Sequence, residues 1–146
     1  FCNRMSVDRV GGCCLFLVCH EPRASALHAV ACHGFGRSLS DVEVFDVLSS
    51  QEPEQVSQAI ALRWQELYKP KAVFFLTDMV GATPYNGVVA FMKSHPDIAH
   101  AVAGVNLPVL LRAITYRSLS HCELIAKLGE DPGQYLQTIP PFQTNR

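Results

Sequence analysis

The chain has 146 residues, of which 49% are hydrophobic and 17% are charged, and its formal net charge is −1. This length and composition predict one domain with a proper hydrophobic core and argue against a disordered chain. No run of Lys and Arg stands out, and no apolar run approaches the ~18 residues of a membrane span, so the sequence indicates neither nucleic-acid binding nor a membrane-spanning segment.

The first 12 residues have no clear hydrophobic period, and the chain does not begin with Met. We interpret residues 1–12 as a disordered segment or a remnant of expression or processing. Residues 13–129 are predicted to form the domain, and residues 130–146 are predicted to be an irregular tail because they are rich in Pro, Gly and Gln. We see no internal repeat or linker within the domain.

Strand and helix patterns alternate along the domain. The predicted strands are residues 13–18, 42–47, 72–77 and 99–104, and the predicted helices are residues 25–33, 53–68, 83–93, 107–114 and 119–128. The first strand is a continuous apolar run, which is typical of a buried parallel strand. Pro53 suits the start of the second helix, and Thr83 is predicted to cap the third, with Pro84 in its first turn.

This alternation predicts an α/β fold, a three-layer sandwich with a four-stranded, mainly parallel sheet in the order 2-1-3-4. Ligands of such sheets bind at the carboxyl ends of the strands, near the point where strand order reverses. His20 follows the first predicted strand and Asp78 follows the third. In this strand order, we expect the two side chains to face each other across the switch point.

A His beside an Asp has a clear chemical use. The carboxylate accepts the N–H of one ring nitrogen, and the other nitrogen keeps a lone pair that attacks an electrophile. Phosphoryl transfer needs little beyond such positioning and charge stabilisation. The start of the helix after Gly81 offers free N–H groups to an anion, and the Thr83 hydroxyl adds a donor. Structural roles also fit: a hydrogen-bonded His20, a turn residue at Asp78 and simple helix capping at Thr83.

The six cysteines include no C-x-x-C pair, so we interpret them as reduced thiols. No G-x-G-x-x-G or Walker pattern is present, and we expect no cofactor. We also expect no metal, because the set that is easiest to imagine as ligands fits no zinc spacing: Cys19, His20, Cys32 and His33. The remaining histidines are expected on the surface or in packing roles.

Three segments resemble one protein family, the mannose-type enzyme IIA of the bacterial sugar phosphotransferase system. They are LFLVCHEPRASAL near the start, AVFFLTDMVGATPYNGVVAF at residues 72–91 and AVAGVNLPVLLRAI at residues 101–114. The last contains the family's Gly-Val-Asn-Leu-Pro stretch. The resemblance covers roughly residues 13–128, and the two later motifs are specific in combination.

The resemblance implies a phosphotransferase of the cytoplasm. In the family, a histidine accepts a phosphoryl group from the histidine phosphocarrier protein HPr and passes it to an enzyme IIB partner for carbohydrate uptake. By position, His20 is the phosphorylated residue, Asp78 orients it and Thr83 is the hydroxyl residue before Pro84. The family fold adds one antiparallel strand that is exchanged between subunits, so a homodimer is expected. The membrane is reached only through a transporter complex.

The chain departs from the family pattern at Glu21 and Pro22, where a Gly usually follows the active His, and in its tail. One alternative is therefore a regulatory binding module that is phosphorylated without sugar transport. Another is a small-molecule binder of flavodoxin-like shape. A third is the phosphoryl donor subunit of dihydroxyacetone kinase, which Asp78 and the motif at residues 104–108 disfavour.

Overall fold

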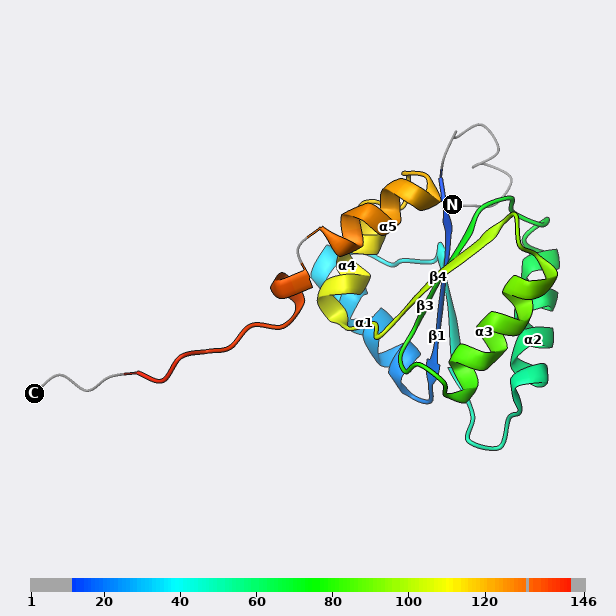
Figure 1. Ribbon diagram of the computed structural model, residues 1–146, viewed down its shortest axis with the longest axis horizontal. Helices are drawn as coiled ribbons and strands as arrows, with labels where there is room; N and C mark the ends of the chain where they lie inside the picture. Colours follow the sequence, from blue (N-terminus) through cyan, green and yellow to red (C-terminus); the bar gives the residue numbers. More distant parts are fainter. Residues whose placement is uncertain (1–11, 131, 143–146) are drawn as a thin grey trace, which may run out of the picture.

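The domain is built in three layers around one sheet (Figure 1). The computed structural model describes residues 12–130 and 132–142, so the predicted segment 1–12 lies outside the described residues apart from Gly12. The strands are β1 (Cys14–His20), β2 (Val42–Val47), β3 (Val73–Thr77) and β4 (Ala99–Ala103). The helices are α1 (Arg23–Phe35), α2 (Pro53–Glu66), α3 (Thr83–Ser94), α4 (Leu107–Thr115) and α5 (His121–Gly129), and a 3-10 turn, η2, covers Pro132–Tyr135.

The sheet has the order β2-β1-β3-β4, and every neighbouring pair is parallel. The predicted α/β fold and strand order are thereby confirmed. Among residues 12–130 and 132–142 the sheet contains no antiparallel strand. The exchanged strand that the family resemblance implied is therefore not part of the described sheet.

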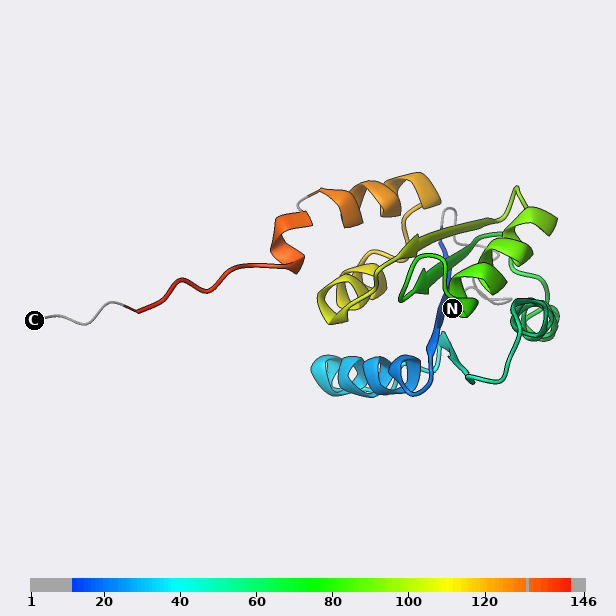
Figure 2. The same cartoon turned by 60° about the horizontal axis from the view of Figure 1, so that its bottom comes forward.

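Helices cover both faces of the sheet. Figures 1 and 2 show α2 and α3 on one face and α1, α4 and α5 on the other. The two central strands, β1 and β3, therefore lie between layers of helices. As a separate point, none of the helices in the described part of the chain is long and apolar enough to cross a membrane.

The core follows from this placement, because a strand that is covered on both faces must be apolar at successive positions. Residues 14–19 of β1 and the whole of β3 are buried. Phe16 lies 5.2 Å from Phe75 between ring centroids, and Phe75 lies 5.5 Å from Phe91 of α3. Burying one such ring contributes roughly 1.5–3 kcal/mol relative to leaving it exposed. These contacts hold β1, β3 and α3 in fixed positions relative to one another.

The first strand is longer than its apolar run predicts. The prediction ends it at residue 18, whereas β1 continues to His20, which pairs with Val47 of β2. The next backbone N–H, that of Glu21, also donates to the carbonyl of Val47 at 3.0 Å. Pairing with β2 therefore extends the strand beyond its apolar residues. As a result His20 is the last residue of a strand and not a loop residue.

The start of α3 corrects the predicted cap. Ala82 is the cap residue: its backbone is extended, and its carbonyl accepts from the N–H of Asn86 at 2.9 Å. Thr83 is therefore the first residue of the helix, and the prediction that it caps α3 is wrong. Further along, Gly87 allows α3 to approach α2 closely, since a Cβ at this position would lie 2.5 Å from Cγ1 of Val56.

The last helix and the tail differ in detail from the prediction. Ser120 and Glu123 form a capping box, so α5 begins at His121 and not at residue 119. The tail, which is predicted to be irregular, contains the turn η2, after which residues 136–142 are extended or irregular. Figure 1 shows this segment running away from the sheet. Its large apolar side chains, Leu136, Ile139 and Phe142, are exposed.

Candidate active site

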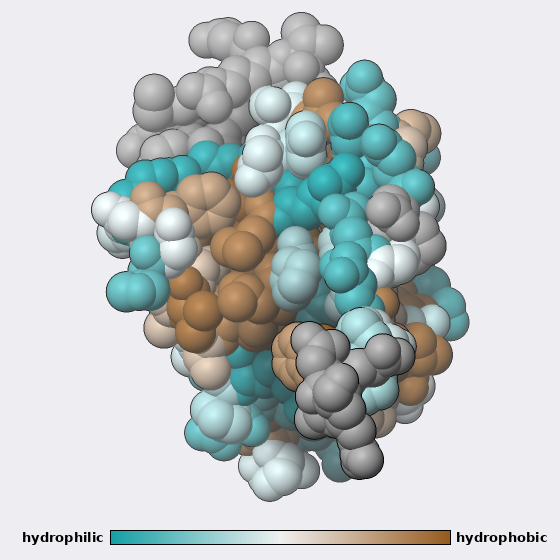
Figure 3. Space-filling view, turned by 90° about the vertical axis from the view of Figure 1, so that its left-hand side faces the viewer, coloured by the Kyte–Doolittle hydropathy of each residue, from teal (hydrophilic) through white to brown (hydrophobic). Residues whose placement is uncertain are grey.

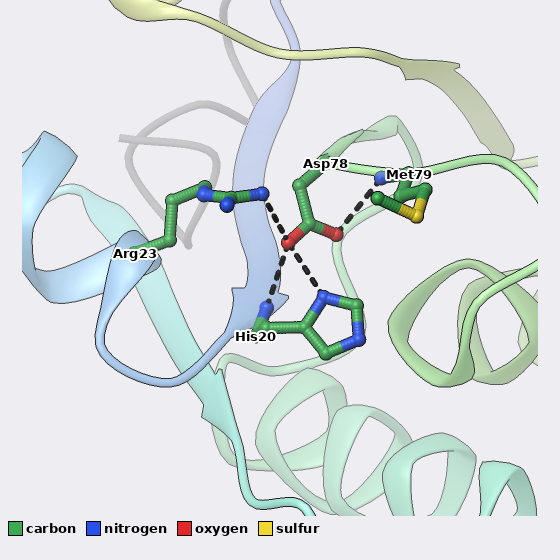
Figure 4. A network of polar contacts seen from close by, with 4 residues as sticks. All are labelled: His20, Arg23, Asp78 and Met79. Atoms are coloured by element: carbon green, nitrogen blue, oxygen red, sulfur yellow. Dashed lines mark hydrogen bonds and ion pairs between the residues drawn. The ribbon is translucent and has the colours of Figure 1, made fainter.

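His20 and Asp78 meet at the carboxyl ends of β1 and β3, the two neighbouring central strands (Figure 4). The ring nitrogen Nδ1 of His20 lies 2.8 Å from Oδ2 of Asp78. The side chain of Asp78 is 1% exposed, whereas that of His20 is 42% exposed. A buried carboxylate thus lies against one edge of a ring whose other edge is open to solvent.

Backbone donors hold the carboxylate in place. The N–H of His20 donates to Oδ2 of Asp78 at 3.0 Å, and the N–H of Met79 donates to Oδ1 at 2.9 Å. Burial raises the pKa of the Asp78 carboxyl, but hydrogen bonds from the backbone and ring of His20 and from Met79 outweigh it, so this pKa lies below its ordinary value. Asp78 is therefore an anion at neutral pH.

The ionised carboxylate decides which ring nitrogen of His20 carries the proton. An anion accepts hydrogen bonds and donates none, so Nδ1 must bear the hydrogen that points at Oδ2. The lone pair of the neutral ring is then on Nε2, and Figure 4 shows this nitrogen on the side of the ring away from Asp78. The arrangement presents one nucleophilic nitrogen at the sheet's carboxyl end.

Arg23 belongs to the same network, and the sequence reasoning missed it. It is the first residue of α1, and its Nη1 donates to Oδ2 of Asp78 at 3.0 Å (Figure 4). Three donors therefore converge on one carboxylate oxygen. The signal in the sequence was a cation three residues after His20, at a helix start beside the expected switch point.

Thr83, the third predicted site residue, starts α3 just after the loop that follows Asp78. Gly81 in this loop has a φ of 82°, a left-handed conformation that favours glycine. Because the loop turns there, the first turn of α3 follows directly on the strand end that carries Asp78. Thr83 is partly buried. Its role as a donor to a phosphoryl group stays a prediction.

Cys19 is the nearest competing nucleophile in sequence, and its environment suppresses its reactivity. The residue is fully buried in β1. Burial, followed by the negative charge of Asp78, raises the pKa of its thiol to about 12. A thiol with this pKa carries almost no thiolate at neutral pH. In the described residues, no three or more His, Cys, Asp or Glu side chains are grouped as metal ligands.

Apolar side chains are exposed in the loops at the same end of the sheet. Leu48 follows β2, and Met79 and Val80 follow Asp78 in the loop after β3. All three are more than two-fifths exposed: 45% for Leu48, 58% for Met79 and 70% for Val80. Exposed apolar residues next to a reactive group are typical of a surface that receives another macromolecule.

Three comparisons with known proteins agree with one another. The family model described as "PTS system fructose IIA component" matches residues 14–128. The PTS system fructose-specific EIIA component of Bacillus subtilis (strain 168) is 44% identical over 45 residues, which are 31% of this chain and 30% of that relative. The chain thus aligns with less than a third of that relative's length.

Two solved structures of similar fold are described as IIA components of phosphotransferase systems. The mannose/sorbose specific IIA subunit of the phosphotransferase system from Enterococcus faecalis has a TM-score of 0.78 and 22% identity, covering 92% of this chain and 99% of that one. The phosphotransferase system component EIIA from Streptococcus agalactiae has a TM-score of 0.74 and 20% identity, covering 85% and 95%. At these identities the likeness is one of fold.

Proposed function

Because the chain belongs to the PTS fructose IIA component family, of the mannose type, we propose that it carries a phosphoryl group for a sugar phosphotransferase system. In this proposal, His20 accepts the group from phosphorylated HPr and passes it to an enzyme IIB partner. The observation that carries the proposal is the hydrogen bond between Nδ1 of His20 and buried Asp78, which leaves Nε2 as the open nucleophile.

The chemical step needs no proton transfer. The lone pair of Nε2 attacks the phosphorus of the phosphohistidine on HPr, a P–N bond forms at His20, and the P–N bond to HPr breaks with its electron pair returning to the imidazole of HPr. The hydrogen on Nδ1 stays against Asp78, which balances the positive charge that builds on the ring. Transfer to the enzyme IIB partner repeats the exchange, with the acceptor's nucleophile attacking the phosphorus.

The remaining parts of the site support this chemistry. The first turn of α3 presents backbone N–H groups that favour an anion, and the Thr83 hydroxyl is the proposed additional donor to the phosphoryl oxygens. HPr is proposed to dock on the loops that expose Leu48, Met79 and Val80. The proposal places the protein in the cytoplasm, with the membrane reached only through the transporter complex.

We also propose a homodimer. β4 lies at the edge of the sheet, and beside it is a cavity of about 150 Å³ between β4 and α3 that is mostly apolar. Residues 136–142 are extended or irregular with exposed apolar side chains, as a segment that adds a strand to a partner's sheet edge would require. Hydrophobic residues also gather on the face that carries α1, α4 and α5 (Figure 3), and exposed Val30 and Ile125 lie on α1 and α5.

The test of the phosphocarrier proposal is a transfer assay with phosphoenolpyruvate, enzyme I and cognate HPr, read by mass spectrometry under alkaline conditions. We expect one added phosphate on the native protein and none on His20→Ala. His33→Ala is the matched control because His33 is an exposed histidine on α1, and it should be phosphorylated like the native protein. Phosphate on His20→Ala, or none on either protein with cognate HPr, would overturn the proposal.

The same assay separates transport from regulation. Addition of a cognate enzyme IIB domain should remove the phosphate from the native protein and place it on that domain. A phosphoprotein that keeps its phosphate but changes its binding partners would instead indicate the regulatory binding module.

A further inference from the structure

Arg23 and His20 share one acceptor atom. Nη1 of Arg23 and Nδ1 of His20 lie 3.0 Å and 2.8 Å from the same oxygen, Oδ2 of Asp78. The guanidinium approaches from α1, and Figure 4 shows it on the opposite side of Oδ2 from the imidazole. The carboxylate is almost fully buried, whereas the side chain of Arg23 is 51% exposed. The positive charge of Arg23 is therefore close enough to change the electrostatic potential at the His20 ring.

Acidic residues also lie near His20 in the sheet or in the sequence. Asp78 comes from the end of β3, Asp46 lies on β2 where it pairs with Cys19 of β1, and Glu21 follows His20 directly. Asp46 accepts the backbone N–H of Ser25 at 3.0 Å and also the Ser25 hydroxyl. Each negative charge near the ring stabilises the protonated imidazolium, which has no lone pair on Nε2. Arg23 supplies positive charge to this group.

We propose that Arg23 is a positioning residue for His20: by binding Oδ2 of Asp78 it fixes the carboxylate and offsets part of its charge, and it thereby disfavours protonation of Nε2. The inference deepens the proposed function and rests on it, because the proposed function is what makes Nε2 of His20 the nucleophile. A purely structural arginine would hold the loop and leave the protonation of His20 unchanged.

Loss of the positive charge has a definite consequence. In Arg23→Gln, a neutral side chain that still donates hydrogen bonds replaces the cation, so the imidazolium becomes more stable. The midpoint of His20 protonation should then lie at higher pH than in the native protein, because a positive charge near the ring has been removed. Arg23→Lys keeps the charge and should leave the midpoint close to that of the native protein.

The first readout is the NMR titration of the His20 ring C2–H, whose signal is assigned by its loss in His20→Ala. Arg37→Ala is the matched control, since Arg37 is an exposed arginine beyond the other end of α1. A raised midpoint in Arg23→Gln, with Arg23→Lys and Arg37→Ala unchanged, supports the inference. An unchanged midpoint in folded Arg23→Gln, or equal shifts in the Gln and Lys variants, overturns it.

The second readout is the pH dependence of the phosphorylation rate with phosphorylated HPr in excess. The acid limb of the profile should move to higher pH in Arg23→Gln by the same amount as the NMR midpoint. The two proposals fail separately, because the titration needs no phosphoryl transfer. A native protein that takes no phosphate contradicts the phosphocarrier function, whereas phosphorylation with an unmoved acid limb contradicts the role of Arg23.

Discussion

Each end of the sheet holds a contact made by a histidine, and the two contacts are chemically opposite. At the carboxyl end, Nδ1 of half-exposed His20 lies against buried Asp78. At the amino end, the ring of His100 on β4 lies 3.9 Å from that of His121 at the start of α5, measured between centroids. One histidine has an anion as its partner, and the other pair consists of two rings that repel each other when both are charged.

The contact between the two histidines at the amino end leaves polar ring atoms without hydrogen bonds in the described part of the chain. Nδ1 of His100 and Nε2 of His121 are buried and find no hydrogen-bond partner among the described residues. Burial, and then the charge of His100, lowers the pKa of His121 below its ordinary value of 6.5, although a hydrogen bond with the backbone of Val73 raises it in part. The ring of His121 is therefore neutral at neutral pH, and it packs near Phe74.

A buried carboxylate beside the ring, and not a histidine alone, therefore distinguishes the carboxyl end and suits it to the proposed chemistry. A carboxylate fixes the tautomer of a neighbouring histidine and balances positive charge on its ring. The contact between His100 and His121 joins two imidazole rings, which do neither for each other. Single substitutions at either end can remove one part of this contrast at a time.

The largest effect is expected from Asp78→Asn. An amide in place of the carboxylate can turn its NH₂ group toward Nδ1, which then accepts a hydrogen bond and places the ring proton on Nε2. The nucleophilic lone pair would be lost from the open side of the ring. We expect the rate of phosphorylation by HPr to fall roughly 10²- to 10³-fold.

The measurement is single-turnover phosphorylation of Asp78→Asn followed by mass spectrometry. Asp46→Asn is the control, because Asp46 is a carboxylate on neighbouring β2 that is bonded to Ser25 and not to His20. A native rate in Asp78→Asn would show that the carboxylate is structural, and the contrast between the two ends of the sheet would lose its chemical meaning.

The fold is predictable because its signals are local. Continuous apolar runs at residues 13–18 and 72–77 indicate strands that are buried on both faces, and the alternation with helices limits the topology to few forms. The neighbouring placement of β1 and β3 then follows from the strand order. For this reason the sequence alone predicts that His20 and Asp78 face each other, although they lie 58 positions apart.

Other features depend on side-chain directions that no local pattern encodes. Arg23 reaches Asp78 across 55 positions, and its ion pair depends on the angle at which α1 leaves β1. The contact between the tilted rings of His100 and His121 depends on where α5 packs against the sheet. The predicted cap of α3 is wrong because Thr83 beside Pro84 resembles a cap, whereas the carbonyl of Ala82 accepts the N–H of Asn86.

A smaller effect is expected at the amino end from His121→Phe. Since the pKa of His121 is lowered in the folded protein, the unfolded chain takes up the proton first as the pH falls below about 6.5. The stability contributed by the neutral ring is therefore present above that pH and is lost as the pH falls towards the lowered folded value. Phenylalanine keeps an aromatic ring beside Phe74 and His100 but removes this titration.

Thermal unfolding at pH 7.5 and pH 5.5 measures the effect. We expect the Tm of the native protein to fall by a few degrees more than that of His121→Phe. His33→Phe, at an exposed position, should keep the native pH dependence. An identical pH dependence in His121→Phe and the native protein would mean that the His100–His121 contact does not resist protonation.

The smallest effect on activity is expected from Cys19→Ala, which lies next to His20 in β1. The thiol is fully buried and its pKa is raised to about 12, so it serves as a small apolar side chain. Its loss should leave the phosphorylation rate within about twofold of native, because His20 keeps its own contacts with Asp78. The free energy of unfolding should fall by about 1 kcal/mol, as expected for a small cavity.

Alkylation directly compares the reactivity of the buried thiol of Cys19 with that of an exposed thiol. Iodoacetamide at pH 8 should label exposed Cys122 in the folded protein well before Cys19, and Cys122→Ala serves as the stability control because its side chain lies at the surface. Rapid labelling of Cys19, or a large loss of phosphorylation in Cys19→Ala, would assign part of the chemistry to the thiol. Cys19 and His20 would then share the reactivity that we propose for His20 alone. That proposal rests on Cys19 being buried and His20 being exposed.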